Sequence, residues 1–216
     1  MNTPSISERE EQEVLRAVGV LRSENLVLIP TETFYGIAAD PCSEGAVGKL
    51  SRIKSRDLGA GIPLIVGSSA VATTLSDPGP PEILELRSLL ERAFWPGPLT
   101  LVVSASGAKQ IAAAVFGPNQ TLAIRVSSHP IANRLAAASG GAITATSANP
   151  HGEPPPTTYA DARAYFPEME GIDALCGGAT KPSTLVLVTK LPFRILREGA
   201  ITKAQLEAVV GREQVE

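Results

Sequence analysis

Hydrophobic residues recur at helical spacing in several stretches of the chain. Val14, Val18 and Leu21 form one apolar stripe, and Ser7 with Glu10 three residues later is the pattern of a capping box at a helix start. Similar spacing predicts further helices. Together the expected helices run from Ser7 to about residue 21, from about 43 to 53, and over 82–94, 131–138, 158–165 and 201–210.

Short continuous apolar runs lie between these helices and predict strands that are covered on both faces. The expected strands are 26–29, 63–66, 99–103, 121–126, 142–145, and stretches around 172–175, 184–188 and 193–197. In the run 121–126, Leu122, Ile124 and Val126 face one way and Thr121 and Arg125 the other. With no internal repeat and no long linker, the pattern predicts one α/β domain over 1–216 around a mixed sheet.

Composition narrows the function classes. Hydrophobic residues make up 44% of the 216 residues and aromatic residues only 4%, so the core must be aliphatic. The formal net charge of −3 weighs against a dedicated nucleic-acid binder, which is usually basic. Two cysteines and two histidines are too few for a disulfide framework or a zinc site. The polar N-terminus and the lack of a long apolar run lead us to expect a soluble, cytoplasmic protein with no membrane partner.

Several standard catalytic motifs are missing from the chain. It contains no GxxxxGK[ST] phosphate loop, no GxGxxG after the first expected strand, no GxSxG elbow and no HExxH helix. What remains are cationic and small polar residues at the ends of expected strands. Ligands of open α/β sheets gather at such ends, so these residues are the candidates for a binding site.

The first two candidate segments each have a structural alternative. Residues 30–36, PTETFYG, offer two threonine hydroxyls and a carboxylate that could orient a small polar substrate, or form only a turn. Lys54 and Arg56 can converge on one anion only if their helix ends near Lys54. Otherwise they complement the dipole of the last helical turn.

The remaining candidates are single side chains on or beside strands. Arg125 in mid-strand must either face a cavity or be paired with an acid, because an unpaired buried charge is too costly. Ser147 and Asn149 suit phosphate oxygens or a purine edge, or a hydrogen-bonded turn. Ser183 and Arg197 add to the polar end of the same expected sheet.

Taken in order, these segments resemble the YrdC-type threonylcarbamoyl-AMP synthases, a family that includes YciO-like members. The matching stretches cover roughly residues 10 to 200. They are PTETFYGIAAD (30–40), the KxR of Lys54 and Arg56, FWPGPLTLVV (94–103), TLAIRV (121–126), TSAN (146–149), PSTLV (182–186) and ILREG (195–199).

The resemblance implies a twisted mixed sheet flanked by helices, with one deep, positively lined cavity. It also implies an enzyme, a nucleotidyltransferase that joins L-threonine, bicarbonate or CO2, and ATP to give threonylcarbamoyl-AMP and pyrophosphate. Proteins of a transfer complex would then pass the group to tRNA, with which this chain makes at most a weak contact. Mg²⁺ would arrive with ATP, and no protein side chain is expected to bind a metal.

The family's motif positions give each residue an expected role. Lys54 and Arg56 are the expected catalytic residues. Threonine would be held by Thr33, Arg125, Ala145 and Ser183. The nucleotide would be held by Lys54, Arg56, Thr121, Ser147, Asn149, Pro155 and Arg197.

Two departures from the family pattern leave alternatives open. Asp57 stands where proline is common, and Gly67 stands where many members carry a histidine. One alternative is a paralogue with a different carbamoyl or adenylate substrate. Another is an RNA-binding module, whose affinity would fall steeply with salt. An interaction protein without activity fits less well, because the cationic and SxN residues are present.

Overall fold

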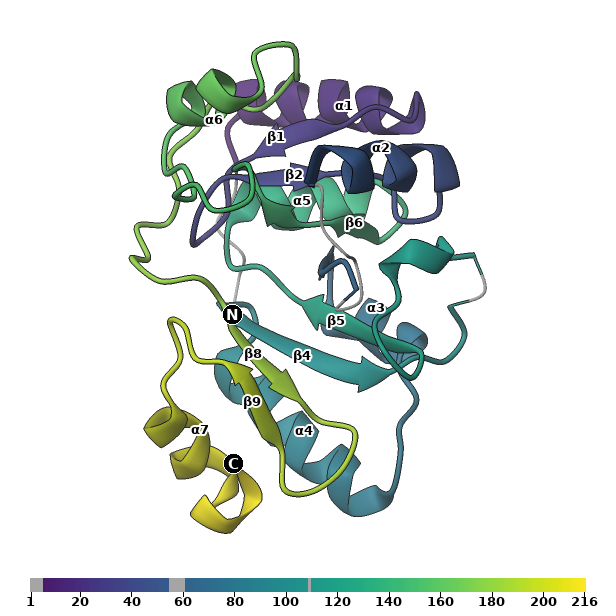
Figure 1. Cartoon of the computed structure of the whole chain (residues 1–216), viewed down its shortest axis with the longest axis vertical. Helices are drawn as coiled ribbons and strands as arrows, with labels where there is room; N and C mark the ends of the chain where they lie inside the picture. Colours follow the sequence, from purple (N-terminus) through teal and green to yellow (C-terminus); the bar gives the residue numbers. More distant parts are fainter. Residues whose placement is uncertain (1–5, 55–60, 109) are drawn as a thin grey trace.

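The computed structural model describes residues 6–54, 61–108 and 110–216 (Figure 1). The helices are α1 (Glu8–Arg22), α2 (Glu44–Lys54), α3 (Ser69–Leu75), α4 (Pro81–Phe94), η2 (Ala113–Val115), α5 (Pro130–Ala138), α6 (Tyr159–Tyr165), α7 (Lys203–Val210) and η3 (Arg212–Gln214). The strands are β1 (Val27–Ile29), β2 (Gly36–Ala38), β3 (Leu64–Val66), β4 (Leu99–Ser104), β5 (Thr121–Arg125), β6 (Ala142–Thr144), β7 (Thr146–Ser147), β8 (Thr184–Leu187) and β9 (Arg194–Arg197).

The strands form two sheets. A six-stranded sheet has the order β6-β3-β5-β4-β8-β9, and a three-stranded sheet has the order β1-β2-β7. In the larger sheet β3 is parallel to β5 and β4 is parallel to β8, while the other pairs are antiparallel. The predicted α/β class with a mixed sheet flanked by helices is therefore confirmed, and the small sheet is an addition to it.

Several strands are covered on both faces, as their apolar runs predicted. Along β3, Leu64 and Val66 belong to one hydrophobic cluster and Ile65 to another. The second cluster includes side chains of α1 and α5, which pack against each other. Period-two alternation along a strand therefore joins the two cores. In Figure 1 the small sheet lies with α1 at one end of the molecule, and β4, β8 and β9 lie with α4 and α7 at the other.

The predicted helix start at Ser7 is confirmed. The Ser7 side chain accepts from the backbone of Glu10, and the Glu10 carboxylate accepts from Ser7 N at 2.7 Å, which completes the capping box. The Ser7 hydrogen bonds lower the pKa of the Glu10 carboxyl. Within the described residues, no helix is both long enough and apolar enough to cross a membrane.

The strand predicted around 172–175 is wrong. The preceding chain makes only one bridge, between Leu28 and Gly171, and then leaves the sheet. The buried Tyr35 hydroxyl contacts the carbonyl oxygen of Ala174 at 2.5 Å and accepts from Ala174 N at 3.0 Å. A side chain therefore supplies the partners that a neighbouring strand would have offered, and the segment runs as a loop toward β8.

Candidate functional site

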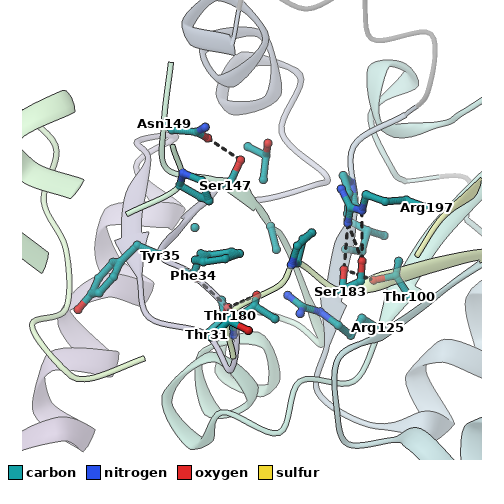
Figure 2. A pocket seen from close by; sticks show the side chains of 18 residues that line it. Thr31, Phe34, Tyr35, Thr100, Arg125, Ser147, Asn149, Thr180, Ser183 and Arg197 are labelled. Carbon is teal, nitrogen blue, oxygen red and sulfur yellow. Dashed lines mark hydrogen bonds between the residues drawn. The ribbon is translucent and has the colours of Figure 1, made fainter. Parts of the chain in front are cut away.

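A pocket of about 470 Å³ lies between the two sheets, and residues from both line it (Figure 2). Its size falls within the usual range for small-molecule sites, about 300–1,000 Å³. The lining residues are Thr31, Thr33, Phe34, Tyr35, Gly36, Pro63, Leu64, Thr100, Arg125, Ala145, Thr146, Ser147, Asn149, Pro155, Thr180, Pro182, Ser183 and Arg197.

The segment between β1 and β2 forms a tight turn at the pocket wall. The Thr31 hydroxyl donates to Phe34 O at 2.8 Å and accepts from Thr33 N at 3.1 Å. Thr33 itself is buried and lines the pocket. The segment therefore forms a turn and also part of the pocket wall.

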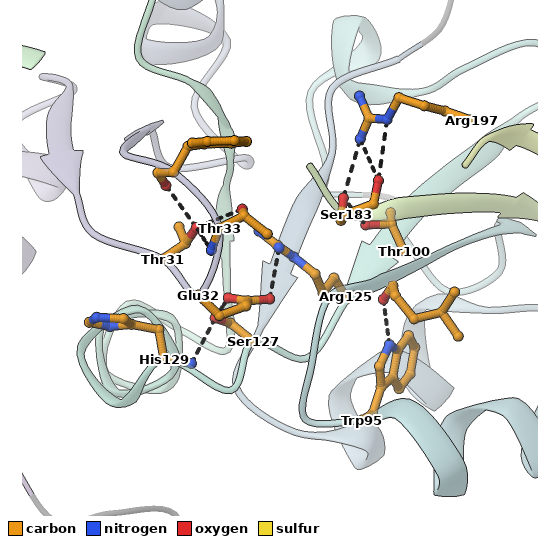
Figure 3. Close-up of polar contacts among 12 residues, drawn as sticks. Thr31, Glu32, Thr33, Trp95, Thr100, Arg125, Ser127, His129, Ser183 and Arg197 are labelled. Carbon is orange, nitrogen blue, oxygen red and sulfur yellow. Dashed lines mark hydrogen bonds and ion pairs between the residues drawn. The ribbon is translucent and has the colours of Figure 1, made fainter. Parts of the chain in front are cut away.

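Arg125 also combines its two alternatives. It is 7% exposed on β5, and its Nη1 donates to Glu32 Oε1 at 2.7 Å in a buried ion pair. The same arginine lines the pocket. The strand therefore buries the cation against an acid while keeping it at the wall of the cavity (Figure 3).

Lys54 ends α2 and is 2% exposed. Its Nζ donates to Ser147 O at 2.7 Å, to Asn149 O at 2.5 Å and to Asn149 Oδ1 at 3.3 Å. The Ser147 hydroxyl donates to Asn149 Oδ1 at 2.6 Å. The ammonium group thus fastens the loop after β7, whose Ser147 and Asn149 line the pocket.

The opposite wall comes from β4, β8 and β9. Arg197 donates to Ser183 O through Nη2 at 2.9 Å and through Nε at 3.2 Å. Thr100 Oγ1 donates to Ser183 Oγ at 3.0 Å. These contacts hold Ser183 and Arg197 together at the end of the larger sheet, beside Arg125 in Figure 2.

Most of the expected site residues meet in this one pocket. Those that line it are Thr33, Arg125, Ala145, Ser147, Asn149, Pro155, Ser183 and Arg197. Two expected residues are not among the described lining. Thr121 begins β5, four residues before Arg125, and its hydroxyl donates to Pro118 O at 2.9 Å. Lys54, expected to be catalytic and to bind the nucleotide, contacts the loop of Ser147 and Asn149 instead. The expected role of Arg56, and the departure at Asp57, lie outside the described residues.

Sequence reasoning missed part of the lining. Phe34 belongs to a segment that was singled out for its threonine hydroxyls and carboxylate, but the phenylalanine side chain was not considered. Thr100 carries a buried hydroxyl within an apolar strand, which is the one signal that could have identified it. Thr180 lies in the loop before β8, which Gly177 N and Ala179 N join to the carbonyl oxygens of Thr31 and Glu32, and no local sequence pattern marks it.

The part of the pocket lining that the structure describes is positively charged. Arg125 and Arg197 contribute guanidinium groups, and no Asp or Glu is among the lining residues that the structure describes. In the described ranges, no three His, Cys, Asp or Glu side chains cluster as a metal ligand set. Hydroxyl, amide and guanidinium donors therefore dominate the polar part of the wall, which suits ligands with carboxylate or phosphate groups.

Fold and pocket together define an α/β protein with a small-molecule-sized pocket between two sheets, whose described lining carries arginines and no acidic residue. The sequence model of the Sua5/YciO/YrdC domain, described as "Telomere recombination", matches residues 19–199. The chain belongs to this family.

Named relatives agree with the family match. A threonylcarbamoyl-AMP synthase of Pyrococcus abyssi is 33% identical over 210 residues, covering 95% of this chain and 59% of the relative. One of Halorhodospira halophila is 37% identical over 191 residues, covering 87% of this chain and 92% of the relative. The crystal structure of P. abyssi Sua5 complexed with L-threonine superposes with a TM-score of 0.86 at 31% identity, covering 99% of this chain and 61% of that one. The chain thus spans about three fifths of the Pyrococcus proteins and nearly all of the Halorhodospira protein.

Proposed function

We propose that this chain is a nucleotidyltransferase that makes L-threonylcarbamoyl-AMP from L-threonine, bicarbonate or CO2, and ATP. The observation that carries the proposal is the convergence of Thr33, Arg125 and Ser183 with Ser147, Asn149 and Arg197 in one pocket. The names of the relatives and the threonine complex of P. abyssi Sua5 support the choice of substrate.

The proposed reaction has two bond-forming steps. The free amine of threonine adds to the carbon of CO2 and loses a proton, which gives a carbamate. A carbamate oxygen then attacks the α-phosphorus of ATP while the bond from that phosphorus to the bridging oxygen breaks, and pyrophosphate leaves. Neither step requires a protein nucleophile.

Under this proposal the protein contributes position and charge. Arg125 would bind the carboxylate of threonine, with the hydroxyls of Thr33 and Ser183 beside it. Ser147, Asn149 and Arg197 would bind the nucleotide, and Lys54 would keep the loop of Ser147 in place. Holding two anionic reactants together in a fixed orientation would be the main contribution of such a site to catalysis.

Mg²⁺ and the cellular setting extend the same proposal. The described lining offers hydroxyls but no carboxylate, so phosphate oxygens of ATP would supply most ligands of an accompanying Mg²⁺. The ion would neutralise phosphate charge. We place the reaction in the cytoplasm, where ATP and tRNA occur together, and expect a separate transfer complex to carry the threonylcarbamoyl group to tRNA.

A pyrophosphate-release assay with single omissions tests the proposal. We expect release from ATP only when threonine and bicarbonate are both present, with serine or valine much poorer than threonine. Pyrophosphate release that does not depend on threonine but requires another amino acid would identify the paralogue with a different substrate. No release, together with salt-sensitive tRNA binding, would favour the RNA-binding alternative.

A further inference from the structure

Glu32 lies between two pocket residues but is itself absent from the lining. Thr31, Thr33 and Arg125 line the cavity, whereas Glu32 is not among the described lining and its carboxylate contacts the Arg125 guanidinium (Figure 3). The residue is 8% exposed. An acid in such a place needs partners, because an unpaired buried carboxylate is strongly destabilising.

Both carboxylate oxygens of Glu32 have partners. Oε1 accepts from Arg125 Nη1 at 2.7 Å, and Oε2 accepts a short hydrogen bond from the Ser127 hydroxyl. Ser127 Oγ in turn accepts from His129 N at 3.1 Å, at the start of α5. A continuous chain of hydrogen bonds therefore links the backbone before α5 to the guanidinium at the pocket.

The shape of the guanidinium group explains how these hydrogen bonds can orient Arg125. The group is planar and carries five N–H donors in a fixed arrangement, so a bond that holds one edge fixes the direction of the others. Glu32 accepts from Nη1 of Arg125 without lining the pocket itself, so the same guanidinium can present its other donors to the cavity. Ser127 keeps the carboxylate from rotating.

We propose that Glu32 is a positioning residue that presents Arg125 to the carboxylate of the amino-acid substrate. The inference rests on the proposed function, because it takes threonine as the ligand of Arg125. Glu32 touches neither substrate nor reacting atoms. Its effect is transmitted through the orientation of one guanidinium group.

Calorimetric titration of Glu32→Gln with L-threonine and, separately, with ATP tests the inference. Gln keeps the shape but loses the charge, so the orienting bond weakens to that of a neutral acceptor. We expect threonine affinity to fall about tenfold or more, the scale of a lost charge-assisted hydrogen bond, while ATP affinity changes less than about threefold. Unchanged or tighter threonine binding by the folded variant would overturn the inference.

Two further variants keep the test decisive if Glu32→Gln does not fold. Glu32→Asp retains the charge at a shorter reach and should recover part of the affinity. Ser127→Ala leaves the charge intact and removes the bond that stops the carboxylate from rotating, so it should weaken threonine binding to a smaller extent. Glu11→Gln is the matched control, because it breaks the Glu11–Arg134 ion pair between α1 and α5, away from the pocket. It should leave threonine affinity unchanged.

A spectroscopic measurement separates failure of the inference from failure of the proposed function. A guanidinium held by Glu32 should show resolved ¹⁵N signals for its two terminal nitrogens, identified by their loss in Arg125→Lys, and Glu32→Gln should average them. Averaged signals in the unaltered chain would overturn the anchoring of Arg125. Resolved signals in a chain that binds no threonine would support the anchoring and reject the proposed function instead.

Discussion

Lys54 is almost fully buried, with 2% of the residue exposed. Its ammonium group donates hydrogen bonds to the carbonyl oxygens of Ser147 and Asn149. A compact ammonium suits converging carbonyls, whereas the planar fork of arginine suits carboxylates and phosphates. The lysine at this position therefore contributes first to the shape of the loop that lines the pocket.

Replacement of this lysine should affect turnover far more than folding. We expect Lys54→Ala to keep the fold by circular dichroism and to lower adenylate formation by about 100-fold, the scale of a displaced binding group, because the loop of Ser147 and Asn149 loses its lysine contacts. Lys54→Arg should not restore it. Lys49→Ala on the same helix is the control, because Lys49 binds Glu24 O and Asn25 Oδ1. Full turnover by Lys54→Ala would show that the lysine has no such role.

His129 is a second residue whose burial has a measurable consequence. It is 8% exposed, and its Nε2 contacts Leu175 O at 2.9 Å. Burial lowers the pKa of His129, although the Leu175 carbonyl and the nearby Glu32 and Glu10 act in the opposite direction. The unfolded chain therefore binds the proton more readily than the folded chain.

The sign of the pH dependence follows from this difference. Because the folded-state pKa lies below the unfolded value of about 6.5, the free energy of unfolding should fall as pH drops through and below that value. Thermal unfolding between about pH 7.5 and about pH 5.5 measures it. As the pH is lowered over this range, the midpoint temperature of unfolding should fall further for the unaltered chain than for His129→Gln. Parallel curves for the two proteins would assign the loss to other groups.

At the scale of elements, the turn after β9 is packed without room for a side chain. A Cβ on Gly199 would lie 2.1 Å from Pro182 O and 2.8 Å from the carbonyl carbon of Ser183. Both obstacles are backbone atoms and cannot move as a flexible side chain could. This close approach holds the start of β8, with Ser183, against the end of β9, with Arg197.

Gly199→Ala should separate these two strand ends. We expect the free energy of unfolding to fall by about 1–3 kcal/mol, the usual cost of overpacking, and threonine affinity to fall with it as Ser183 moves. Urea unfolding and calorimetry measure the two effects. Gly19→Ala on α1 is the control, because a Cβ there would meet nothing within 4 Å beyond its chain neighbours and the backbone of its own helix. A Gly199→Ala variant as stable as the unaltered chain would contradict the packing argument.

Elements with a periodic stripe or a continuous apolar run could be predicted from the sequence, and elements without either could not. The stripe and capping box of α1 are local signals, and so are the apolar runs of β3 and β4. Strand β2 (Gly36–Ala38) directly follows the turn-like PTETFY segment, and α3 (Ser69–Leu75) consists mostly of small and polar residues, so both were missed. Loop 172–175 is apolar enough to suggest a strand, but its partners are side-chain groups.

Most residues of the candidate site could be predicted from the sequence, but the contacts between them could not. Each polar segment follows or enters a strand, and strand ends meet at a sheet edge. The pairing of Arg125 with Glu32, 93 residues away in the chain, depends on how the two sheets are packed. The same holds for the contacts of Lys54. Thr121 illustrates the limit, because it shares a face of β5 with Arg125 but lies at the far end of the strand, about 13 Å away.

At the scale of the whole molecule, a chain of net charge −3 carries a pocket whose described lining includes two arginines. Glu32 balances one of these cations in a buried ion pair. A compact cationic site on an acidic protein favours small anionic ligands over an extended polyanion such as tRNA, whose binding depends on many phosphate contacts. This charge distribution supports the proposed synthesis of an activated intermediate over the RNA-binding alternative.

Mass spectrometry of the nucleotide product made from ¹³C-bicarbonate, threonine and ATP tests this account most directly. The account predicts one species that contains AMP, threonine and the labelled carbon, formed in step with pyrophosphate and lost when threonine is omitted. A nucleotide product without the label, or pyrophosphate release with no threonine-containing product, would contradict it.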